Sequence, residues 1–426
     1  MAALLPVFLA IVPLYARRQR RLAADGREIA HMTNRDWGPP PSVDVIVTCY
    51  NERPELLGRC LGSLREQDYR GRIKVWVVDD GSRNRAELLP VLARTVRLGW
   101  RVILSEQNYG KRIAQALALG EGKGKIIVTV DSDTVVAPDG IRRIVAPFRH
   151  RRVGAVTSSL RALNAEASWL AKEIDTRYGL LCERERAAQG FFGSVLCCAG
   201  PFSAFRRTAV QQVLERYLSR SRTGDDLELT NLVLADGYRS EYQPDAKAWT
   251  HVTASVTEFA LLQRRWNGSF YRELPRMLRI VARRDPYLRL DLAARALLPV
   301  LLAGGLLATV VDALRAPQRL PFDAVALALM ALASAGLAPS WRQRSGRRFV
   351  LRYGLVFLLV LLPVRCWAAV TVLWDRWGTR GSVESSLEGS EQAPGVALAD
   401  HVPLRPVDVN GALKFARRFT PAAVEA

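Results

Sequence analysis

Histidine and cysteine are scarce in this chain, which has four of the first and six of the second. No two cysteines form a C-x-x-C pair, and none stands beside a set of histidines. Structural zinc sites depend on such spacings, so the sequence predicts no structural zinc. The adjacent Cys197 and Cys198 stand in an apolar stretch, where we expect them to belong to the core. We infer a reducing compartment for the soluble part of the chain.

The first apolar run also lacks two features of a secretion signal. No basic residues precede the run at 2–15, and no small-x-small cleavage site follows it. A cleaved signal peptide is therefore not expected. The run is short for a complete membrane span, and the basic sequence ARRQRR follows it. We expect residues 1–21 to form a signal-anchor helix whose basic flank stays in the cytoplasm.

Acidic residues are outnumbered, since 41 Asp and Glu stand against 61 Lys and Arg, for a net charge of +20. Such an excess is typical of proteins that bind nucleic acid, an anionic membrane or a phosphorylated substrate. The arginines flank apolar runs of membrane length and do not form a patch interleaved with aromatic residues. The pattern therefore disfavours nucleic acid as a partner.

Residues 42–253 alternate between two kinds of pattern. Short runs rich in β-branched residues occur at Val43–Thr48, Ile73–Val78, Arg101–Leu104 and Ile126–Val130. Helical patterns lie between them, near 53–66, 84–98 and 110–121. This alternation predicts an α/β domain with a largely parallel sheet.

Polar residues follow three of these expected strands, as Tyr50-Asn51-Glu52, Asp79-Asp80-Gly81-Ser82 and Asp131-Ser132-Asp133. Ligands of such sheets gather at the carboxyl ends of the strands, so we expect all three segments to line one crevice. The paired carboxylates of Asp131 and Asp133 suit a hard cation such as Mg²⁺ or Mn²⁺. By itself, the same pair is equally typical of a turn with two solvated acids.

Two further segments carry charges at the start of a helix. Lys111 and Arg112, after Gly110, place two cations and free N–H groups where a diphosphate can bind. Asp225 and Asp226 follow Gly224, far in sequence from the first acids. Each pattern has a plainer interpretation: a solvated basic helix start for the first, and complementation of the helix dipole for the second. A glycosyl transfer, however, needs a carboxylate separate from the metal site to deprotonate the attacking hydroxyl.

The pattern changes after residue 254. Residues 255–290 combine an apolar stripe with arginines, which is typical of helices in a membrane interface and also of an ordinary amphipathic core helix. Apolar runs near 292–313, 321–340 and 350–373 predict transmembrane helices within 291–374. Pro363 and Arg365 interrupt the last run, so it either spans or breaks there, with Val364–Leu373 returning along the inner surface. Residues 375–426 are expected to be a disordered tail that begins with a WGTR segment.

Taken in order, the segments YNE, DDGS, NxGKR, DSDT, ERAAQ, AGPFS, GDDxxLTN, RWNxSFxRE and WGTR resemble the membrane-embedded family 2 glycosyltransferases. The likeness is strongest to hyaluronan synthases, then to chitin and nodulation chitooligosaccharide synthases. It covers about residues 42–285 and the end of the membrane region. The fold implied is an α/β GT-A nucleotide-diphospho-sugar transferase domain at 42–253, plus an α-helical transmembrane bundle with interface helices.

The resemblance implies a role for each matching residue. The donor nucleotide and diphosphate would meet Tyr50, Glu52, Asp79, Asp80, Lys111, Arg112, Asp131 and Arg265. Asp133, with Asp131, would hold Mg²⁺ or Mn²⁺. The acceptor sugar would be bordered by Gly200, Pro201, Phe202 and Ser203 and would stack on Trp266. Asp226 would be the general base, with Asp225 beside it.

The implied activity is processive, inverting β-glycosyl transfer from UDP-sugars, with the growing polysaccharide passed through the plasma membrane. The catalytic domain would be cytoplasmic and the chain multi-pass, in contact with the lipid bilayer. Hyaluronan synthesis from UDP-GlcNAc and UDP-GlcA is the first interpretation, and chitin or chitooligosaccharide synthesis from UDP-GlcNAc the alternative. A catalytically silent scaffold is the second alternative, and the oligomeric state stays open.

One departure stands out within the interface motif. The family has Q-x-x-R-W, whereas Leu262 stands three residues before Arg265 and Gln263 is displaced by one position. On a helix this shift turns the amide by about 100°. The match to WGTR at Trp377–Arg380, a stretch that lies near the donor site in the family, favours the returning helix over an external tail.

Overall fold

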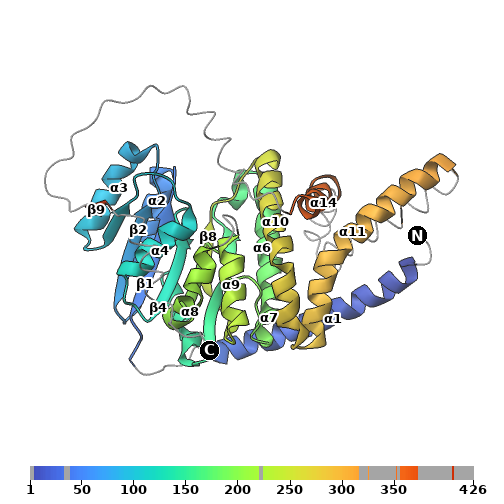
Figure 1. Cartoon of the computed structure of the whole chain (residues 1–426), viewed down its shortest axis with the longest axis horizontal. Coiled ribbons are helices and arrows are strands. Elements are labelled where there is room, and N and C mark those ends of the chain that lie inside the picture. The colour runs from blue at the N-terminus through green and yellow to red at the C-terminus, as the bar shows by residue number, and fades with distance from the viewer. Residues whose placement is uncertain are drawn as a thin grey trace, which may run out of the picture.

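The computed structural model describes residues 4–32, 39–219, 224–315 and 356–372, together with 325, 352 and 405–406. These residues contain one sheet of nine strands in the order β5-β8-β6-β7-β4-β1-β2-β3-β9 (Figure 1). The strands are β1 Val43–Cys49, β2 Ile73–Asp79, β3 Arg101–Leu104, β4 Ile126–Asp131, β5 Thr134–Val136, β6 Val153–Ala162, β7 Phe202–Arg206, β8 Arg239–Thr250 and β9 Arg405–Pro406. Only β5 and β7 run antiparallel to their neighbours, so the predicted, largely parallel sheet is confirmed.

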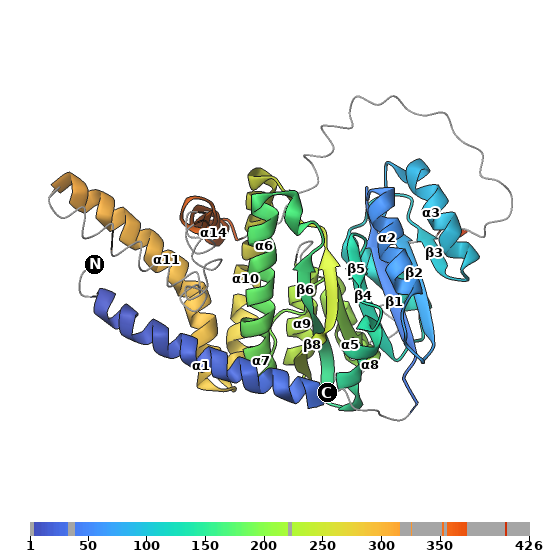
Figure 2. The same cartoon turned by 180° about the vertical axis from the view of Figure 1, so that it is seen from behind.

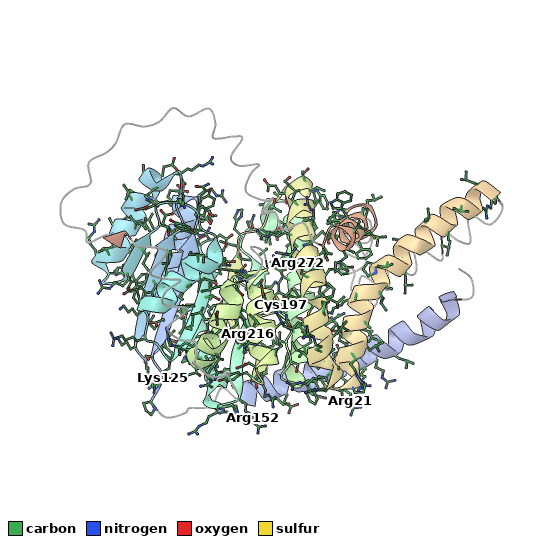
Figure 3. The ribbon with its side chains drawn as sticks, in the orientation of Figure 1. Arg21, Lys125, Arg152, Cys197, Arg216 and Arg272 are labelled. Atoms are coloured by element: carbon green, nitrogen blue, oxygen red, sulfur yellow. The ribbon has the colours of Figure 1, made fainter. Side chains whose placement is uncertain are left out.

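The register of the central strands sets the position of the acidic loops. β1 pairs in step with β2 and with β4, so Cys49 lies opposite Asp79 and Thr48 lies opposite Asp131. The loops after these three strands therefore leave the sheet at the same level. Lys125 and Arg152, which precede β4 and β6, lie at the opposite end of the molecule (Figure 3).

Helices cover both faces of the sheet because its strands alternate their side chains between two apolar layers. Val43, Val45 and Val47 face one layer, where they pack with α2 and α3, and Ile46 faces the other, with α4, α8 and α9. The helices of the domain are α2 Pro54–Arg65, α3 Arg85–Arg97, α4 Lys111–Glu121, α5 Gly140–Val145, α6 Trp169–Leu180, α7 Ala187–Phe191, α8 Arg207–Leu218 and α9 Asp225–Ala235. The predicted helices at 53–66, 84–98 and 110–121 are confirmed as α2, α3 and α4.

The amino-terminal helix is longer than the sequence predicts. α1 spans Leu4–Met32 and continues through the basic segment, where the prediction ended at residue 21. It runs along one end of the molecule beside α7 and β8 (Figure 2). Gly26 allows this approach, since a Cβ there would stand 2.3 Å from the carbonyl oxygen of Ala187. The part of α1 beyond residue 21 thus contacts α7, a partner that the sequence of α1 does not reveal.

Two long helices follow the sheet. α10 spans Val256–Ala282 and packs against α9, while α11 spans Pro286–Arg315 and contains the first predicted membrane segment. The first half of α11 is joined to α1 and α7. Asp291 accepts hydrogen bonds from Tyr15 Oη of α1 at 2.5 Å and from Gln189 Nε2 of α7 at 2.9 Å. Within the described part of the chain, no helix is both long enough and apolar enough to cross a membrane.

The last described helix lies beside α10. A π-helical turn, Phe357–Leu361, precedes α14, which spans Leu362–Val370 (Figure 1). Pro363 stands in the first turn of α14, where a missing N–H is tolerated, so the chain stays helical at that residue. Arg365 Nε donates to Asn267 Oδ1 at 3.0 Å, so the charged side chain of Arg365 contacts α10. The predicted segment 321–340, apart from residue 325, and the WGTR segment lie outside the described residues, as does the tail except for 405–406.

Candidate active site

The loops after β1, β2 and β4 are joined by hydrogen bonds. Asn51, which adopts a left-handed conformation at φ 49°, accepts a hydrogen bond to its Oδ1 from the N–H of Arg83 at 2.8 Å. Ser132 Oγ donates to Glu52 Oε2 at 2.7 Å. Tyr50 is half-buried at the start of the first loop. The expectation that the three segments meet at one edge of the sheet is therefore confirmed.

The two aspartates at the end of β2 hold backbone in place. Asp80 accepts the N–H groups of Tyr109 at 2.9 Å and Gly110 at 2.8 Å, one on each oxygen. Asp79 is fully buried and accepts Arg85 Nε at 2.6 Å. These bonds fix the loop that leads into α4 and position its first residue. Direct contact of either aspartate with a nucleotide stays a prediction.

Lys111 connects the two groups of acids that are distant in sequence. As the first residue of α4, it places Nζ 2.6 Å from Asp131 Oδ1 and 3.4 Å from Asp225 Oδ2. Burial lowers the pKa of Lys111, but the charges of Asp131 and Asp225 outweigh that effect and raise it above its usual value. The lysine is therefore a fixed cation between the acid at the end of β4 and the acid at the start of α9.

Gly200 lies between this ion pair and Asp226. Its N–H donates to Asp226 Oδ2 at 3.1 Å, and a Cβ at Gly200 would stand 2.9 Å from Lys111 Nζ. A side chain at position 200 would therefore displace the Lys111 ammonium from its place beside Asp131. The second oxygen of Asp226 accepts the N–H of Leu227 at 2.8 Å. Asp226 thus adjoins the Lys111–Asp131 pair, as the proposed chemistry requires.

The neighbouring acids Asp225 and Asp226 differ in basicity. Burial raises the pKa of Asp225, yet the cations Lys111, Arg112 and Arg265 outweigh it and hold that pKa below its usual value. Burial, and then the charge of Asp225, raises the pKa of Asp226. The two carboxyls interact strongly and titrate as a pair. Asp226 is the more basic member, which suits a group that accepts a proton.

Asp133 follows Asp131 and Ser132 in the loop after β4, and two threonine hydroxyls donate hydrogen bonds to it. Its Oδ1 accepts Thr250 Oγ1 at 3.1 Å and Thr134 Oγ1 at 3.3 Å. Over the described residues, no cluster of three or more His, Cys, Asp or Glu side chains has the arrangement of a metal site. The pair Asp131 and Asp133 therefore fits a cation such as Mg²⁺ or Mn²⁺ only if substrate phosphates and water supply the remaining ligands, which is usual for Mg²⁺.

Arg112 has a different position from the one predicted. Its side chain is buried, with Nη2 2.7 Å from Glu228 Oε2 and Nη1 donating to the carbonyl oxygen of Tyr217 at 2.8 Å. The guanidinium also stacks over the Tyr217 ring. Successive residues of a helix point about 100° apart, so Lys111 meets Asp131 and Asp225 while Arg112 joins α4 to α9. In this structure Arg112 connects two helices, and its contact with a diphosphate stays a prediction.

The predicted acceptor residues fall into two groups. Pro201 and Ser203 are parts of the backbone frame, because the Pro201 carbonyl accepts the N–H of Asp131 at 3.3 Å and the Ser203 hydroxyl donates to the Ala199 carbonyl at 2.7 Å. Trp266, on α10, is 41 % exposed and leaves a ring face available. Arg265 precedes it and is one of the cations acting on Asp225.

Sequence reasoning missed two side chains at this site. As expected, Cys198 is buried in the core and Cys197 packs against it, but Cys197 is half-buried and its Sγ also lies 3.8 Å from Asp226 Oδ2. Figure 3 draws Cys197 near the middle of the view. His251 follows β8. Its ring Nε2 lies 3.0 Å from Arg53 Nη2, and its backbone N–H donates to the carbonyl oxygen of Asp133. The position of His251 directly after a strand was an available signal. Cys197 had none, since its apolar neighbours favour a core position.

The arrangement is able to bind anions and to move a proton. Lys111 and Arg265 provide positive charge at one side, and the more basic Asp226 lies across the Lys111 ion pair. Trp266, which follows Arg265 on α10, is exposed. Such a set suits the transfer of a group from a phosphorylated donor to a hydroxyl.

Comparison with known proteins identifies the family. The profile described as "Glycosyltransferase like family 2" matches residues 39–269. An N-acetylglucosaminyltransferase of Sinorhizobium fredii is 40 % identical over 370 residues, which is 84 % of this chain and 88 % of that protein. An N-acetylglucosaminyltransferase of Rhizobium meliloti is 35 % identical over 404 residues, covering 92 % and 93 % of the two chains.

A solved structure has a similar fold. The mannosyltransferase of Pyrobaculum calidifontis, in complex with GDP-Man and Mn²⁺, aligns with a TM-score of 0.52 over 87 % of this chain and 99 % of its own, at 24 % identity. The predicted GT-A-like α/β fold is thereby confirmed. From the profile and the relatives together, the chain belongs to the glycosyltransferase-like family 2 and is a glycosyltransferase.

Proposed function

We propose that this protein is a chitin or chitooligosaccharide synthase, a β-N-acetylglucosaminyltransferase that extends a sugar chain from UDP-GlcNAc. The observation that supports it is the position of Asp226 beside the Lys111–Asp131 ion pair, in a chain whose relatives are named N-acetylglucosaminyltransferases. The hyaluronan interpretation, which we placed first from sequence, has weaker support, because none of these relatives' names refers to hyaluronan.

In this mechanism the acceptor sugar lies between Trp266 and Asp226. Asp226 takes the proton of the acceptor hydroxyl as that oxygen attacks the anomeric carbon of the donor. The bond to the diphosphate breaks in the same displacement, so an α-linked donor gives a β linkage. Lys111 and Arg265 stabilise the charge that develops on the departing diphosphate.

A divalent cation belongs to this proposal. Asp131 and Asp133 would hold Mg²⁺ or Mn²⁺ together with oxygens of the donor, and the cation would neutralise charge on the diphosphate. The lysine–aspartate pair at Asp131 is compatible with that role, because Lys111 can meet the diphosphate itself once the donor is bound. The mannosyltransferase of similar fold was solved with Mn²⁺ and GDP-Man.

We also propose a membrane location with the catalytic domain on the cytoplasmic side. The part of α11 from Leu297 onward supports it, since Leu297, Val300, Leu301 and Leu307 are exposed. Large exposed apolar surfaces are typical of sites that contact lipid or protein. Figure 1 shows α11 and α1 projecting together from the domain.

The test uses membranes that contain the full chain, incubated with labelled UDP-GlcNAc and UDP-GlcA, separately and together. We expect incorporation from UDP-GlcNAc alone into a product that chitinase digests. A product that forms only with both donors and is sensitive to hyaluronidase would restore the hyaluronan interpretation. No incorporation from either donor would reject both syntheses.

A further inference from the structure

Arg186 is a buried cation without an acidic partner. It ends the π-helix Leu181–Arg186, which stands between α6 and α7, and only 7 % of its surface is exposed. Its Nη1 donates to Cys182 Sγ at 3.3 Å. No carboxylate among the described residues forms an ion pair with it. Arginine is seldom buried without an anion, because removing its charge from water is costly.

The neighbours of Arg186 do not supply the missing charge. The groups that act on it most are Cys182, Cys197, Cys198 and Tyr242. Burial raises the pKa of Cys198 to about 12 and raises the pKa values of Cys197 and Tyr242 above their usual range. These three groups are therefore neutral at physiological pH. The guanidinium keeps N–H groups for which sulfur and phenol are poor partners.

The segment that carries Arg186 adjoins the active site. Gln189, three residues after Arg186, accepts the N–H of Leu196 at 3.2 Å, and the next residue, Cys197, has its Sγ 3.8 Å from Asp226 Oδ2. The charge of Arg186 also acts on Cys197, although burial is the larger effect and raises the pKa of that thiol. Arg186 therefore stands in the helical segment that packs behind the proposed base.

The local backbone explains how an arginine comes to face inward. A π-helix adds one residue to a turn, which shifts the side chains that follow to a new face, and such turns are frequent at functional sites. Gln189, one turn later, is held by Asp291 at 2.9 Å and by the N–H of Leu196 at 3.2 Å. These bonds anchor the segment that carries Arg186 against α11 and against the chain just before Cys197.

We propose that Arg186 binds the acceptor sugar, donating from its guanidinium to the carbonyl oxygen of an N-acetyl group. The inference rests on the proposed function and adds a residue that recognises the substituent of the sugar. An amide oxygen is a strong acceptor that brings no net charge into the pocket. A carboxylate on a uronic acid offers the same kind of oxygen, and the experiment separates the two.

The test compares Arg186→Met and Arg186→Lys with the matched control Arg184→Met, which makes the same change two residues earlier. With the full chain in membranes, the KM for N,N′-diacetylchitobiose as acceptor should rise about tenfold or more in Arg186→Met, the loss expected for one charge-assisted hydrogen bond. The KM for UDP-GlcNAc should stay within about twofold of wild type, a change that corresponds to less than one such bond. Cellobiose, which lacks N-acetyl groups, should be affected much less. Arg184→Met should leave all three values unchanged.

Thermal unfolding separates binding from a structural role. If Arg186 serves the substrate, its replacement by an apolar residue removes an unpaired buried charge, and the Tm should stay the same or rise. A lower Tm with equal losses for donor and both acceptors would overturn the inference. Selective loss of UDP-GlcA use would overturn it in favour of a uronic acid. If Arg186→Met fails to fold, Arg186→Lys keeps the charge, and an unchanged acceptor KM in that variant would also count against guanidinium binding.

These outcomes differ from a failure of the proposed function. In that case the wild-type chain would form no chitinase-sensitive product, whatever residue stands at position 186.

Discussion

Gly200 donates its backbone N–H to Asp226 Oδ2 at 3.1 Å, and that bond brings the proposed base to the edge of the donor site. The same glycine approaches Lys111 so closely that a Cβ there would stand 2.9 Å from the lysine Nζ. Asp131 and Asp226, which are almost a hundred residues apart in sequence, thereby lie on either side of Gly200. The predictions below test what each group does there.

Asp226→Asn should abolish transfer and spare donor binding. An amide cannot take the proton of the acceptor, and loss of a general base usually lowers the rate by about 10²–10⁴-fold. Incorporation of labelled GlcNAc measures the rate, and UDP binding to the purified chain measures the donor site. Asp236→Asn, at the other end of α9, is the control. Retention of more than a tenth of the activity in Asp226→Asn would reject Asp226 as the base.

The pH profile should report the raised pKa of Asp226. Activity needs the ionised carboxylate, so the rate should fall as the pH drops through a value above the usual 3.9 or so of aspartate. Burial and the charge of Asp225 both raise that pKa. In Asp225→Asn the second cause is gone, so the acid limb should move to lower pH. A limb that stays in place or moves upward contradicts the assignment.

Lys111→Met should weaken use of the donor. The substitution removes the cation that lies 2.6 Å from Asp131 and 3.4 Å from Asp225. We expect kcat/KM for UDP-GlcNAc to fall by about 10²-fold, the effect typical of losing one group that stabilises developing charge. Lys123→Met, in the loop after α4, is the control for loss of a lysine. Equal kinetics in the two variants would remove Lys111 from the mechanism.

Chelation should stop the reaction reversibly. Incubation with EDTA should remove the activity, and Mg²⁺ or Mn²⁺ should restore it, because the diphosphate would otherwise leave without charge neutralisation. Asp133→Asn should raise the cation concentration required for half-maximal activity. Full activity in EDTA would show that the two acids after β4 serve another purpose.

Gly224→Ala tests how α10 supports the start of α9. Gly224 has φ +80°, and a Cβ there would stand 2.5 Å from the side chain of Ser269. Gly237→Ala is the matched control, since Gly237 has φ +91° but open space around it. Both variants should lose about 1–2 kcal/mol to the left-handed backbone, measured by chemical unfolding. Gly224→Ala alone should lose further stability and activity, and Ser269→Gly should restore part of both. Identical losses in the two alanine variants would argue against a tight α9–α10 contact.

Sequence patterns predicted the sheet and its neighbouring helices well because their signals are local. Ile126–Val130 and Arg101–Leu104 are short β-rich runs, and the acids after the strands identified the edge that carries the site. Other features depend on contacts between distant residues. The extension of α1 to Met32 rests on packing at Ala187, and no periodicity within α1 indicates that partner.

Side-chain directions at the site were also beyond the sequence. Lys111 and Arg112 are adjacent cations at one helix start, yet only the first meets Asp131 and Asp225, because Glu228 on α9 pairs with the second. Cys197 packs against the core, as its apolar neighbours predict, but the sequence does not reveal that its Sγ also contacts Asp226 of α9. Each outcome is decided by a residue at least twenty-nine positions away in sequence.

The placement of α1 has a consequence for the order of folding. This helix precedes the whole sheet in the sequence, yet it lies on α7 and β8, and Tyr15 bonds to Asp291, 276 residues later. Closing so long a loop carries a large entropic penalty until the intervening chain has become compact. Docking of α1 therefore belongs to the final stage of assembly, after the sheet has formed.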